Sequence, residues 1–326
     1  MHKISVCIIC YNQEQYIFDC LNSVIEQTGN FELEVVIRDD CSTDGTRKKC
    51  EQFIREYGNK NKNIYIKLLD SDINIGANKN ILQVLKYCTG DFIAFCEGDD
   101  YWCDIHKLDK QLTLALKNPE VDFYVHPAFY RYTDGRIEKK HWPLQNYKRC
   151  FQSDIFKADW QFAPTSSYFV RSNRLNSLPK WFENATIGDI YLEVYFSERG
   201  IIVLNEYLSV YRYLSSSSWS LALTKDNAHV YEKKIRHYKN YNECLDRVLN
   251  DYPELKIGVI RKQVLNNIQL IKAFLKMRKY KNVKSLSLNI LRNDLYHLNL
   301  RQVAFFTLGV CPKFLKLILN FKRLNK

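Results

Sequence analysis

Four short apolar runs in residues 1–100 alternate with three segments whose apolar residues recur at helical spacing. The runs are Ile4–Cys10, Leu33–Arg38, Ile64–Leu68 and Asp91–Cys96. They are rich in β-forming residues and do not alternate between apolar and polar, which is typical of strands buried on both faces. A chain that alternates strand and helix in this way folds into right-handed βαβ units. The sequence therefore predicts an α/β fold, a mostly parallel sheet with helices on both faces.

Polar residues follow three of these runs at the point where each strand is expected to end. They are Tyr11 and Asn12 after the first run, Asp39 and Asp40 after the second, and Glu97, Asp99 and Asp100 after the fourth. In open α/β sheets, ligands bind outside the carboxyl ends of the strands. We therefore expect these side chains to converge on one crevice.

The segment from Glu97 to Asp100 places three acids within four residues. Like charges that lie a few ångströms apart raise each other's pKa, so such a cluster favours a bound cation. Carboxylates at the end of a buried strand suit a hard divalent ion, which often keeps waters and substrate phosphates as further ligands. The alternative, from these residues alone, is an acidic loop that caps a helix starting near Asp104. The first run lacks the GxGxxG pattern of dinucleotide-binding folds, so a phosphate bound here would need a metal ion.

The excess of positive charge lies in the last third of the chain. The net charge is +12, but residues 1–223 contain 26 basic and 29 acidic residues, whereas residues 224–326 contain 22 basic and 7 acidic residues. From Asn227 onward, the apolar residues recur at helical spacing. Length and charge asymmetry together predict two domains, an α/β domain over residues 1–223 and a smaller, basic, all-helical C-terminal domain over residues 224–326.

The most apolar stretch of the basic part, residues 303–319, is interrupted by Pro312, Lys313 and Lys316. It is therefore too broken to span a bilayer. With the basic residues that follow, it is typical of a helix that lies on an anionic membrane surface. The alternative is a short helix that packs on its own domain with a solvated lysine face. No nucleic-acid recognition motif is present, so we expect no nucleic-acid partner.

The eleven cysteines stand within apolar runs and not at the spacings of a disulfide framework. The first residues lead directly into a strand pattern, without the apolar core of a signal peptide. We interpret the cysteines as reduced thiols of a cytoplasmic protein. Cys7 and Cys10 form a CxxC pair, but no second pair or histidine follows at zinc spacing, so we expect structural core cysteines.

Four motifs resemble, in order, those of family 2 glycosyltransferases with the GT-A fold. They are Ser5–Asn12, Val36–Thr46, Asn74–Gly76 followed by Lys79 and Asn80, and Glu97–Trp102. The resemblance fades after Ser220. It implies an inverting, metal-dependent enzyme of hexosyltransferase type that moves a sugar from a nucleotide diphosphate sugar, by family frequency a UDP-sugar, to a hydroxyl of a glycan or lipid-linked acceptor. The product implied is an envelope or capsular polysaccharide, made in the cytoplasm or at the inner face of the plasma membrane.

The resemblance also assigns the acidic segment to a divalent cation, Mn²⁺ or Mg²⁺. Asp99 is implied as the main metal ligand. Glu97, which replaces the first aspartate of the family motif, and Asp100 are implied on the ribose, on water or at a second coordination position.

By the same resemblance, four residues contact the nucleotide of the donor: Tyr11, Asn12, Asp39 and Asp40. A helix N-cap is the alternative for the two aspartates; since one acid suffices for a cap, we expect one to contact the ligand and the other to cap. Lys79 stands where the family usually has arginine and is implied over the diphosphate or the sugar. A solvated helix lysine is the alternative.

The later part of the resemblance makes Asp189 the general base, which deprotonates the acceptor hydroxyl as that oxygen attacks the anomeric carbon. Asp189 could instead be a first-turn acid that complements a helix dipole. Trp160 is implied in the acceptor pocket, with aromatic core packing as the alternative. Leu214 stands where relatives often have a histidine, which leaves Arg212 or nearby serines for phosphate binding. The serine run Ser215–Ser218 is also typical of a mobile lid.

Two rival functions use the same residues. A nucleotidyltransferase would also pair acids with a metal ion, but such enzymes usually carry a basic glycine-rich first loop, and Tyr11-Asn12-Gln13 is not one. A non-catalytic nucleotide-sugar-binding protein is the other, supported by Glu97 and by Leu214 in place of the histidine.

Overall fold

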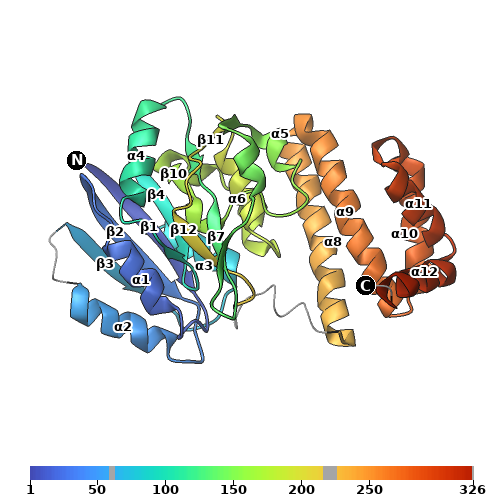
Figure 1. The fold of residues 1–326 in the computed structure, drawn as a ribbon, viewed down its shortest axis with the longest axis horizontal. Coiled ribbons are helices and arrows are strands. Elements are labelled where there is room, and N and C mark those ends of the chain that lie inside the picture. Colours follow the sequence, from blue (N-terminus) through green and yellow to red (C-terminus); the bar gives the residue numbers. More distant parts are fainter. Residues whose placement is uncertain (59–62, 216–225, 325–326) are drawn as a thin grey trace. The chain divides into compact units, whose positions relative to one another are not determined.

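The computed structural model describes residues 1–58, 63–215 and 226–324. The chain divides into two compact units, Met1–Leu221 and Ala222–Lys326. The first unit combines sheets and helices, and the second contains helices (Figure 1). The predicted domain boundary between residues 223 and 224 lies outside the described residues.

The larger sheet of the first unit has eight strands among the described residues, in the order β3-β2-β1-β4-β10-β6-β11-β9. Four of them run parallel to one another: β1 (His2–Cys10), β2 (Phe31–Asp39), β3 (Ile64–Leu69) and β4 (Phe92–Glu97). The other four are shorter and of mixed direction: β6 (Phe123–Val125), β9 (Arg149–Cys150), β10 (Phe169–Arg171) and β11 (Ile201–Val203). The predicted fold class is therefore confirmed, and the first four strands lie within two residues of their predicted bounds.

Helices cover both faces of this sheet. On one face, side chains of β1, β2 and β4 form a continuous apolar core with three helices: α1 (Ile17–Ile25), α2 (Thr46–Tyr57) and α4 (Lys107–Lys117). Because side chains alternate along a strand, the other residues of β1 and β4 point to the opposite face. There α3 (Ala77–Leu85) contacts β1. Phe95 of β4 packs on Phe196 of α6 (Asp189–Phe196), with ring centroids 6.1 Å apart.

A second, smaller sheet fixes the loop that follows β4. Its order is β5-β12-β7-β8, with β5 (Tyr101–Trp102), β7 (Ala128–Arg131), β8 (Ile137–Lys139) and β12 (Ser209–Arg212). The acidic segment runs from the end of β4 to the start of β5, so the larger sheet holds one of its ends and the pairing of β5 with β12 holds the other. Residues 131–156 contribute β8, β9 (Arg149–Cys150) and the short helix α5 (Gln152–Ile155).

The eleven cysteines are all free thiols. Cys7 and Cys10 of the CxxC pair are both buried in β1. Burial raises the pKa of the Cys7 thiol well above its ordinary value. A buried thiol that resists ionisation packs as a small apolar group, which agrees with the expectation of core cysteines.

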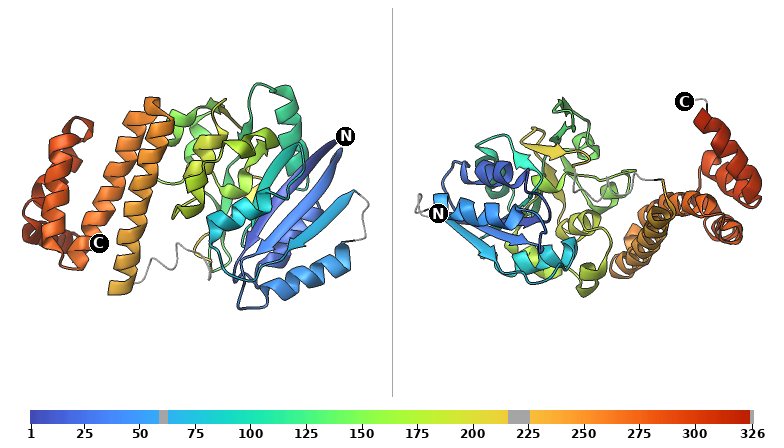
Figure 2. Two further views of the ribbon diagram at one scale, coloured as in Figure 1. Left: turned by 180° about the vertical axis from the view of Figure 1, so that it is seen from behind. Right: turned by 90° about the horizontal axis from the view of Figure 1, so that it is seen from below.

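The second unit consists of helices around its own apolar core. They are α8 (Ala228–Asp251), α9 (Lys256–Lys276), α10 (Tyr280–Asn293), α11 (Leu300–Gly309) and α12 (Pro312–Leu324). Helices α8 and α9 lie side by side, as both views of Figure 2 show. Asn227 caps α8 by accepting a hydrogen bond from the backbone N–H of Val230 at 3.0 Å. No helix in the described part of the chain is long and apolar enough to cross a membrane.

Candidate active site

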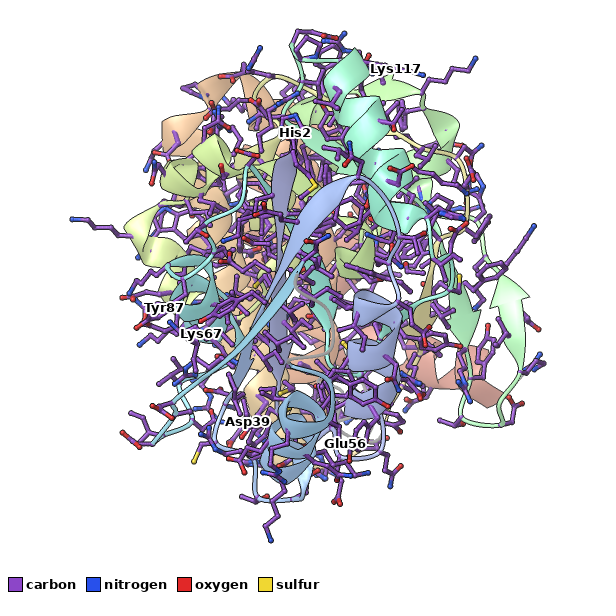
Figure 3. The ribbon with its side chains drawn as sticks, turned by 90° about the vertical axis from the view of Figure 1, so that its left-hand side faces the viewer. His2, Asp39, Glu56, Lys67, Tyr87 and Lys117 are labelled. Atoms are coloured by element: carbon purple, nitrogen blue, oxygen red, sulfur yellow. The ribbon has the colours of Figure 1, made fainter. Side chains whose placement is uncertain are left out.

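A cavity of about 570 Å³ lies at the carboxyl ends of β1 and β4. In Figure 3, Asp39 at the end of β2 lies at the edge of the sheet opposite His2, where β1 begins. The cavity lining comes from the loops after β1, β2 and β4, the starts of α3 and α6, and the end of β12. Its polar side chains include Tyr11, Gln13, Asp40, Asn78, Glu97, Asp99, Asp189, Tyr211 and Arg212. Among the residues singled out from the sequence, the cavity thus brings together Tyr11, Asp40, Glu97, Asp99, Asp189 and Arg212.

Besides Asp40, three carboxyl groups line this cavity, those of Glu97, Asp99 and Asp189. Burial, together with the charges of Asp99 and Asp189, raises the pKa of Glu97 to about 8. Burial also raises the pKa of Asp99, although the Ser215 hydroxyl, which donates to Asp99 Oδ2 at 2.7 Å, and the Arg212 guanidinium oppose that shift. Because Glu97 and Asp99 are desolvated and the charges of Asp99 and Asp189 act on Glu97, a cation in the cavity would be strongly favoured.

The acidic loop lies close against β1 because its second residue is glycine. The Gly98 backbone N–H donates to the Ile9 carbonyl at 3.0 Å. A Cβ atom at position 98 would lie 2.7 Å from the Cβ of Cys10, a separation that real Cβ atoms do not adopt. Any other residue here would push Glu97 and Asp99 away from the strand end.

Arg212 joins the acidic loop to α1. Its guanidinium donates to the Asp99 carbonyl oxygen at 2.5 Å and to the Asp19 carboxylate. The rings of Tyr16 and Tyr101 lie 4.9 and 4.7 Å from the guanidinium carbon. The side chain is therefore held in place while it lines the cavity.

Asp100 is buried and does not line the cavity. Its Oδ1 accepts the backbone N–H of Arg212 at 2.9 Å, and its Oδ2 has no hydrogen-bond partner within the described residues. Burial, with the charges of Asp99 and Glu97, raises the pKa of Asp100. This side chain ties the loop to β12.

The two aspartates at the end of β2 have different surroundings. Asp39 accepts from the backbone N–H of Ser42 at 3.0 Å and from the Ser42 hydroxyl, so it closes the turn after β2. Asp40 accepts from the backbone N–H groups of Ile75 and Gly76, at 2.9 and 2.8 Å, and pairs with Arg38 at 3.0 Å. Only Asp40 of the two lines the cavity, where it also fixes the residues that lead into α3.

Asn12 connects the loops after β1 and β2. Its backbone N–H donates to the Ser42 hydroxyl and its Oδ1 accepts the Thr43 N–H, both at 2.8 Å. Its φ is +53°, which asparagine tolerates better than most residues. Asn12 shapes the loop, whereas its neighbour Tyr11, 41% exposed, lines the cavity.

Asn78, in the first turn of α3, was not identified from the sequence. Its Nδ2 lies 2.9 Å from the carbonyl oxygen of Ala185 and 3.3 Å from those of Phe182 and Ile187. These carbonyls belong to the segment just before Asp189. The only sequence signal for Asn78 was its place between the Asn74–Gly76 turn and Lys79.

Two further residues singled out from the sequence lie outside the cavity lining. Lys79 is half-buried on α3. Trp160 is 42% exposed and packs on Trp142 with ring centroids 5.0 Å apart, while the next residue, Gln161, lines the cavity. Of the predicted serine lid, Ser216 to Ser218 lie outside the described residues.

The carboxylates of the cavity fit a hard divalent cation that shares its coordination with a ligand. Within the described ranges, no group of three or more His, Cys, Asp or Glu side chains could hold a metal ion by themselves. Glu97 and Asp99 offer oxygen donors from one loop, and burial with the negative charges of Asp99 and Asp189 raises the pKa of Glu97, which a bound cation would oppose. Mg²⁺ is commonly bound through one or two carboxylates plus substrate phosphates, which is what this donor set could provide.

Comparison with known proteins gives one family model and several relatives. The model described as glycosyl transferase family 2 matches residues 5–175. The uncharacterized protein Rv1520 of Mycobacterium tuberculosis is 33% identical over 222 residues, which cover 68% of this chain and 62% of that protein. The Escherichia coli UDP-Glc:alpha-D-GlcNAc-diphosphoundecaprenol beta-1,3-glucosyltransferase WfgD is 37% identical over 118 residues, 36% of this chain and 42% of WfgD. The matches therefore span less than two thirds of either relative.

Two solved structures share the fold. Residues 1–349 of Staphylococcus aureus TarS in complex with UDP superimpose with a TM-score of 0.57 at 17% identity, covering 99% of this chain and 92% of that one. The mannosyltransferase PcManGT from Pyrobaculum calidifontis, in complex with GDP-Man and Mn²⁺, gives a TM-score of 0.57 at 14% identity, covering 96% of this chain and 86% of that one.

Proposed function

The chain belongs to glycosyl transferase family 2, and from this premise we propose that it is an inverting glycosyltransferase. The donor is a nucleotide diphosphate sugar, by preference a UDP-sugar. The acceptor is a hydroxyl of a glycan or of a lipid-linked glycan, and the product belongs to a cell-envelope or capsular polysaccharide. The relative WfgD, whose name states glucosyl transfer from UDP-Glc to a diphosphoundecaprenol-linked sugar, supports this choice of donor and acceptor.

The observation that carries the proposal is that Glu97, Asp99 and Asp189 line one cavity at the carboxyl edge of the sheet. Glycosyl transfer needs positive charge beside the leaving diphosphate and a base beside the acceptor hydroxyl. Glu97 and Asp99 suit the first requirement through a bound cation, and Asp189 suits the second. The acceptor oxygen forms a bond to the anomeric carbon as the bond from that carbon to the diphosphate breaks, and Asp189 takes the proton.

The donor would be positioned by the residues around these acids. Tyr11 is exposed enough to place its ring against a nucleobase, and Asp40 lies beside it at the end of β2. The Arg212 guanidinium supplies fixed positive charge at the cavity wall. A divalent cation, held by Glu97 and Asp99 with the donor phosphates, would supply Lewis-acid stabilisation of the departing diphosphate.

The test is turnover by the full chain with a panel of UDP- and GDP-sugars, in Mn²⁺, in Mg²⁺ and in EDTA. Release of nucleoside diphosphate that needs the cation and is lost in Asp99→Asn supports the proposal. Donor binding without release, with or without candidate acceptors, would indicate a non-catalytic binding protein. Formation of a nucleotide sugar from a sugar phosphate would indicate a nucleotidyltransferase.

We also propose that the protein acts in the cytoplasm and reaches the inner face of the plasma membrane through the basic helices of residues 224–326. The excess of 15 positive charges in these residues supports attraction to an anionic lipid surface. Sedimentation with vesicles that contain phosphatidylglycerol, compared with neutral vesicles, tests this contact. Equal sedimentation with both would contradict it.

A further inference from the structure

The second unit contains a cavity of its own, of about 290 Å³. Helices α8, α9 and α12 contribute its lining: Tyr231, Lys234 and Tyr238 from α8, Gln269, Lys272, Leu275 and Lys276 from α9, and Lys316, Leu319 and Asn320 from α12. All of these residues belong to one compact unit. The cavity is therefore separate in the chain from the candidate active site.

Four lysines line this small space, and few anions face them. Among the described residues, the ion pair recorded for the four joins Lys276 to Asp226, at 2.9 Å. Lys316 lies 3.5 Å from the Tyr280 hydroxyl, and Lys234 lies over the Tyr231 ring, 5.5 Å from its centroid. These partners do not carry a negative charge at neutral pH. Four ammonium groups with one carboxylate leave a net positive cavity.

Lys272 is a cavity lysine whose charge is partly desolvated. Desolvation lowers the pKa of its ammonium, and no carboxylate opposes that shift within the described chain. The side chain is exposed on its outer side, so its charge can still be reached from solvent. An anion that entered the cavity would therefore gain a cation that is only partly hydrated.

The remaining lining is apolar or aromatic. Leu275 and Leu319 contribute aliphatic surface, and Tyr231 and Tyr238 contribute half-buried rings. An inorganic ion would leave this surface uncovered. A phosphate attached to a carbon chain or another apolar group would contact both the lysines and the apolar lining.

We propose that this cavity binds a phosphate or diphosphate group that carries an apolar substituent. Lysines act as compact point charges that suit phosphate oxygens, whereas planar, bidentate recognition of a carboxylate favours arginine, which the lining lacks. The same chemistry is offered by a phosphorylated lipid head group and by a water-soluble phosphate ester. The inference uses residues of the second unit alone and does not depend on the proposed function.

The experiment compares two double variants of the full chain that lose the same charge. Lys272→Ala with Lys316→Ala removes two lysines of the cavity. Lys281→Ala with Lys284→Ala removes two exposed lysines of α10 that do not line it. All four side chains are at least partly exposed, so we expect both variants to fold, which circular dichroism checks.

Binding is measured in EDTA, so that metal-dependent binding at the first unit does not contribute. One arm uses vesicles of phosphatidylcholine with phosphatidic acid; the other uses equilibrium dialysis of inorganic diphosphate and of a short-chain alkyl phosphate. We expect the cavity variant to lose affinity by about tenfold or more and the control variant by about twofold or less. If the cavity variant loses affinity for the vesicles alone, the ligand is a lipid head group. If it loses affinity in the dialysis experiment, the ligand is a soluble phosphate ester.

Equal losses in the two variants would overturn the proposal, because they would show a general electrostatic effect of a basic surface. Absence of binding in both arms for the unsubstituted chain would overturn it as well. Sugar-transfer activity plays no part in either readout, so failure here leaves the proposed sugar transfer untouched, and the reverse also holds.

Discussion

The side-chain amide of Asn78 lies 2.9 Å from the carbonyl oxygen of Ala185 and holds the segment that leads into Asp189. The two residues are far apart in sequence, and their contact joins α3, which also lines the cavity, to the segment before α6. Asn78 Nδ2 donates toward three carbonyl oxygens of this segment, those of Phe182, Ala185 and Ile187. Its place in the structure is that of a positioning residue for Asp189.

We predict that Asn78→Ala lowers kcat about ten- to a hundredfold, because displacement of a catalytic group by about 1 Å can cost that much. The KM for the donor should change little, since Asp40, Glu97 and Asp99 keep their contacts. Steady-state kinetics of donor turnover checks the split between kcat and KM. Gln83→Ala, on the same helix and away from this cavity, is the control and should keep the activity of the unsubstituted chain. A parallel rise in KM with unchanged kcat would contradict the positioning role.

Gly188→Ala tests the same contact from the other side. The new Cβ would overlap with the Oδ1 of Asn78, whose amide is held by its hydrogen bonds, so Asp189 should shift. The φ of Gly188 is −112°, which alanine adopts without strain. The double variant Asn78→Ala, Gly188→Ala removes the overlap, so its loss in kcat should be smaller than the product of the two single losses. Independent, multiplicative effects in this double-mutant cycle would mean that the two residues act separately.

We predict that Asp189→Asn and Asp99→Asn fail in different ways. Asp189→Asn removes the proposed base, so transfer should slow about 10²- to 10⁴-fold while the donor still binds. Asp99→Asn removes a proposed cation ligand, so donor binding that depends on Mn²⁺ should weaken. Calorimetric titration of each variant with the donor in the presence of Mn²⁺ measures binding, and single-turnover kinetics measures the transfer rate. Together they separate the effects of the two substitutions. If Asp189→Asn keeps full transfer activity, the base is another group.

The local pattern of apolar and polar residues was enough to predict that the polar residues at the strand ends lie together. Apolar runs without alternation located four parallel strands, and the strand ends then place Tyr11, Asp40 and the Glu97–Asp100 segment at one edge. The sequence could not say which of Asp39 and Asp40 faces the cavity. That choice depends on Ser42, which closes its turn on Asp39, and on the N–H groups of the turn before α3, which bind Asp40.

Contacts between residues distant in sequence were beyond prediction. The two-residue strand β5 is too short to leave a periodic signal, yet its pairing with β12 holds the acidic loop and directs Asp100 to the backbone of Arg212. Asn78 looked like an ordinary polar residue of a first helical turn, because its partners are backbone carbonyls more than 100 residues away. The residue types and their local spacing therefore do not predict such contacts.

Lys107, the first residue of α4, is a fully buried lysine. Its ammonium lies 4.0 Å from the centroid of the Trp102 ring and donates to Gln111 Oε1 at 2.7 Å. Burial lowers the pKa of Lys107 to about 7, and the neighbouring Cys96 and Cys103 only partly oppose that shift. His126 also faces this group, and its own pKa is lowered by burial and by the charge of Lys107.

This burial predicts a pH dependence of stability. In the unfolded chain, a lysine titrates near 10.4, so between pH 7 and that value the unfolded state binds one proton more than the folded state. Stability should therefore rise with pH across this window, by up to about 1.4 kcal/mol per pH unit from this group. Below pH 7 both states carry the charge, and the full cost of burying it remains.

Lys107→Met removes the charge and keeps a similar shape, so the difference in unfolding free energy between the two proteins isolates this effect. Urea unfolding at pH 7, 8 and 9 measures this difference. As pH rises, the free energy of unfolding of the unsubstituted chain should increase relative to that of Lys107→Met, because only the unsubstituted chain has a lysine whose burial cost is lost. Lys117→Met, at the exposed end of the same helix (Figure 3), should run parallel to the unsubstituted chain. If the Lys107→Met curve also runs parallel across this range, the ammonium stays charged in the folded state, and Trp102 with Gln111 stabilises it better than burial penalises it.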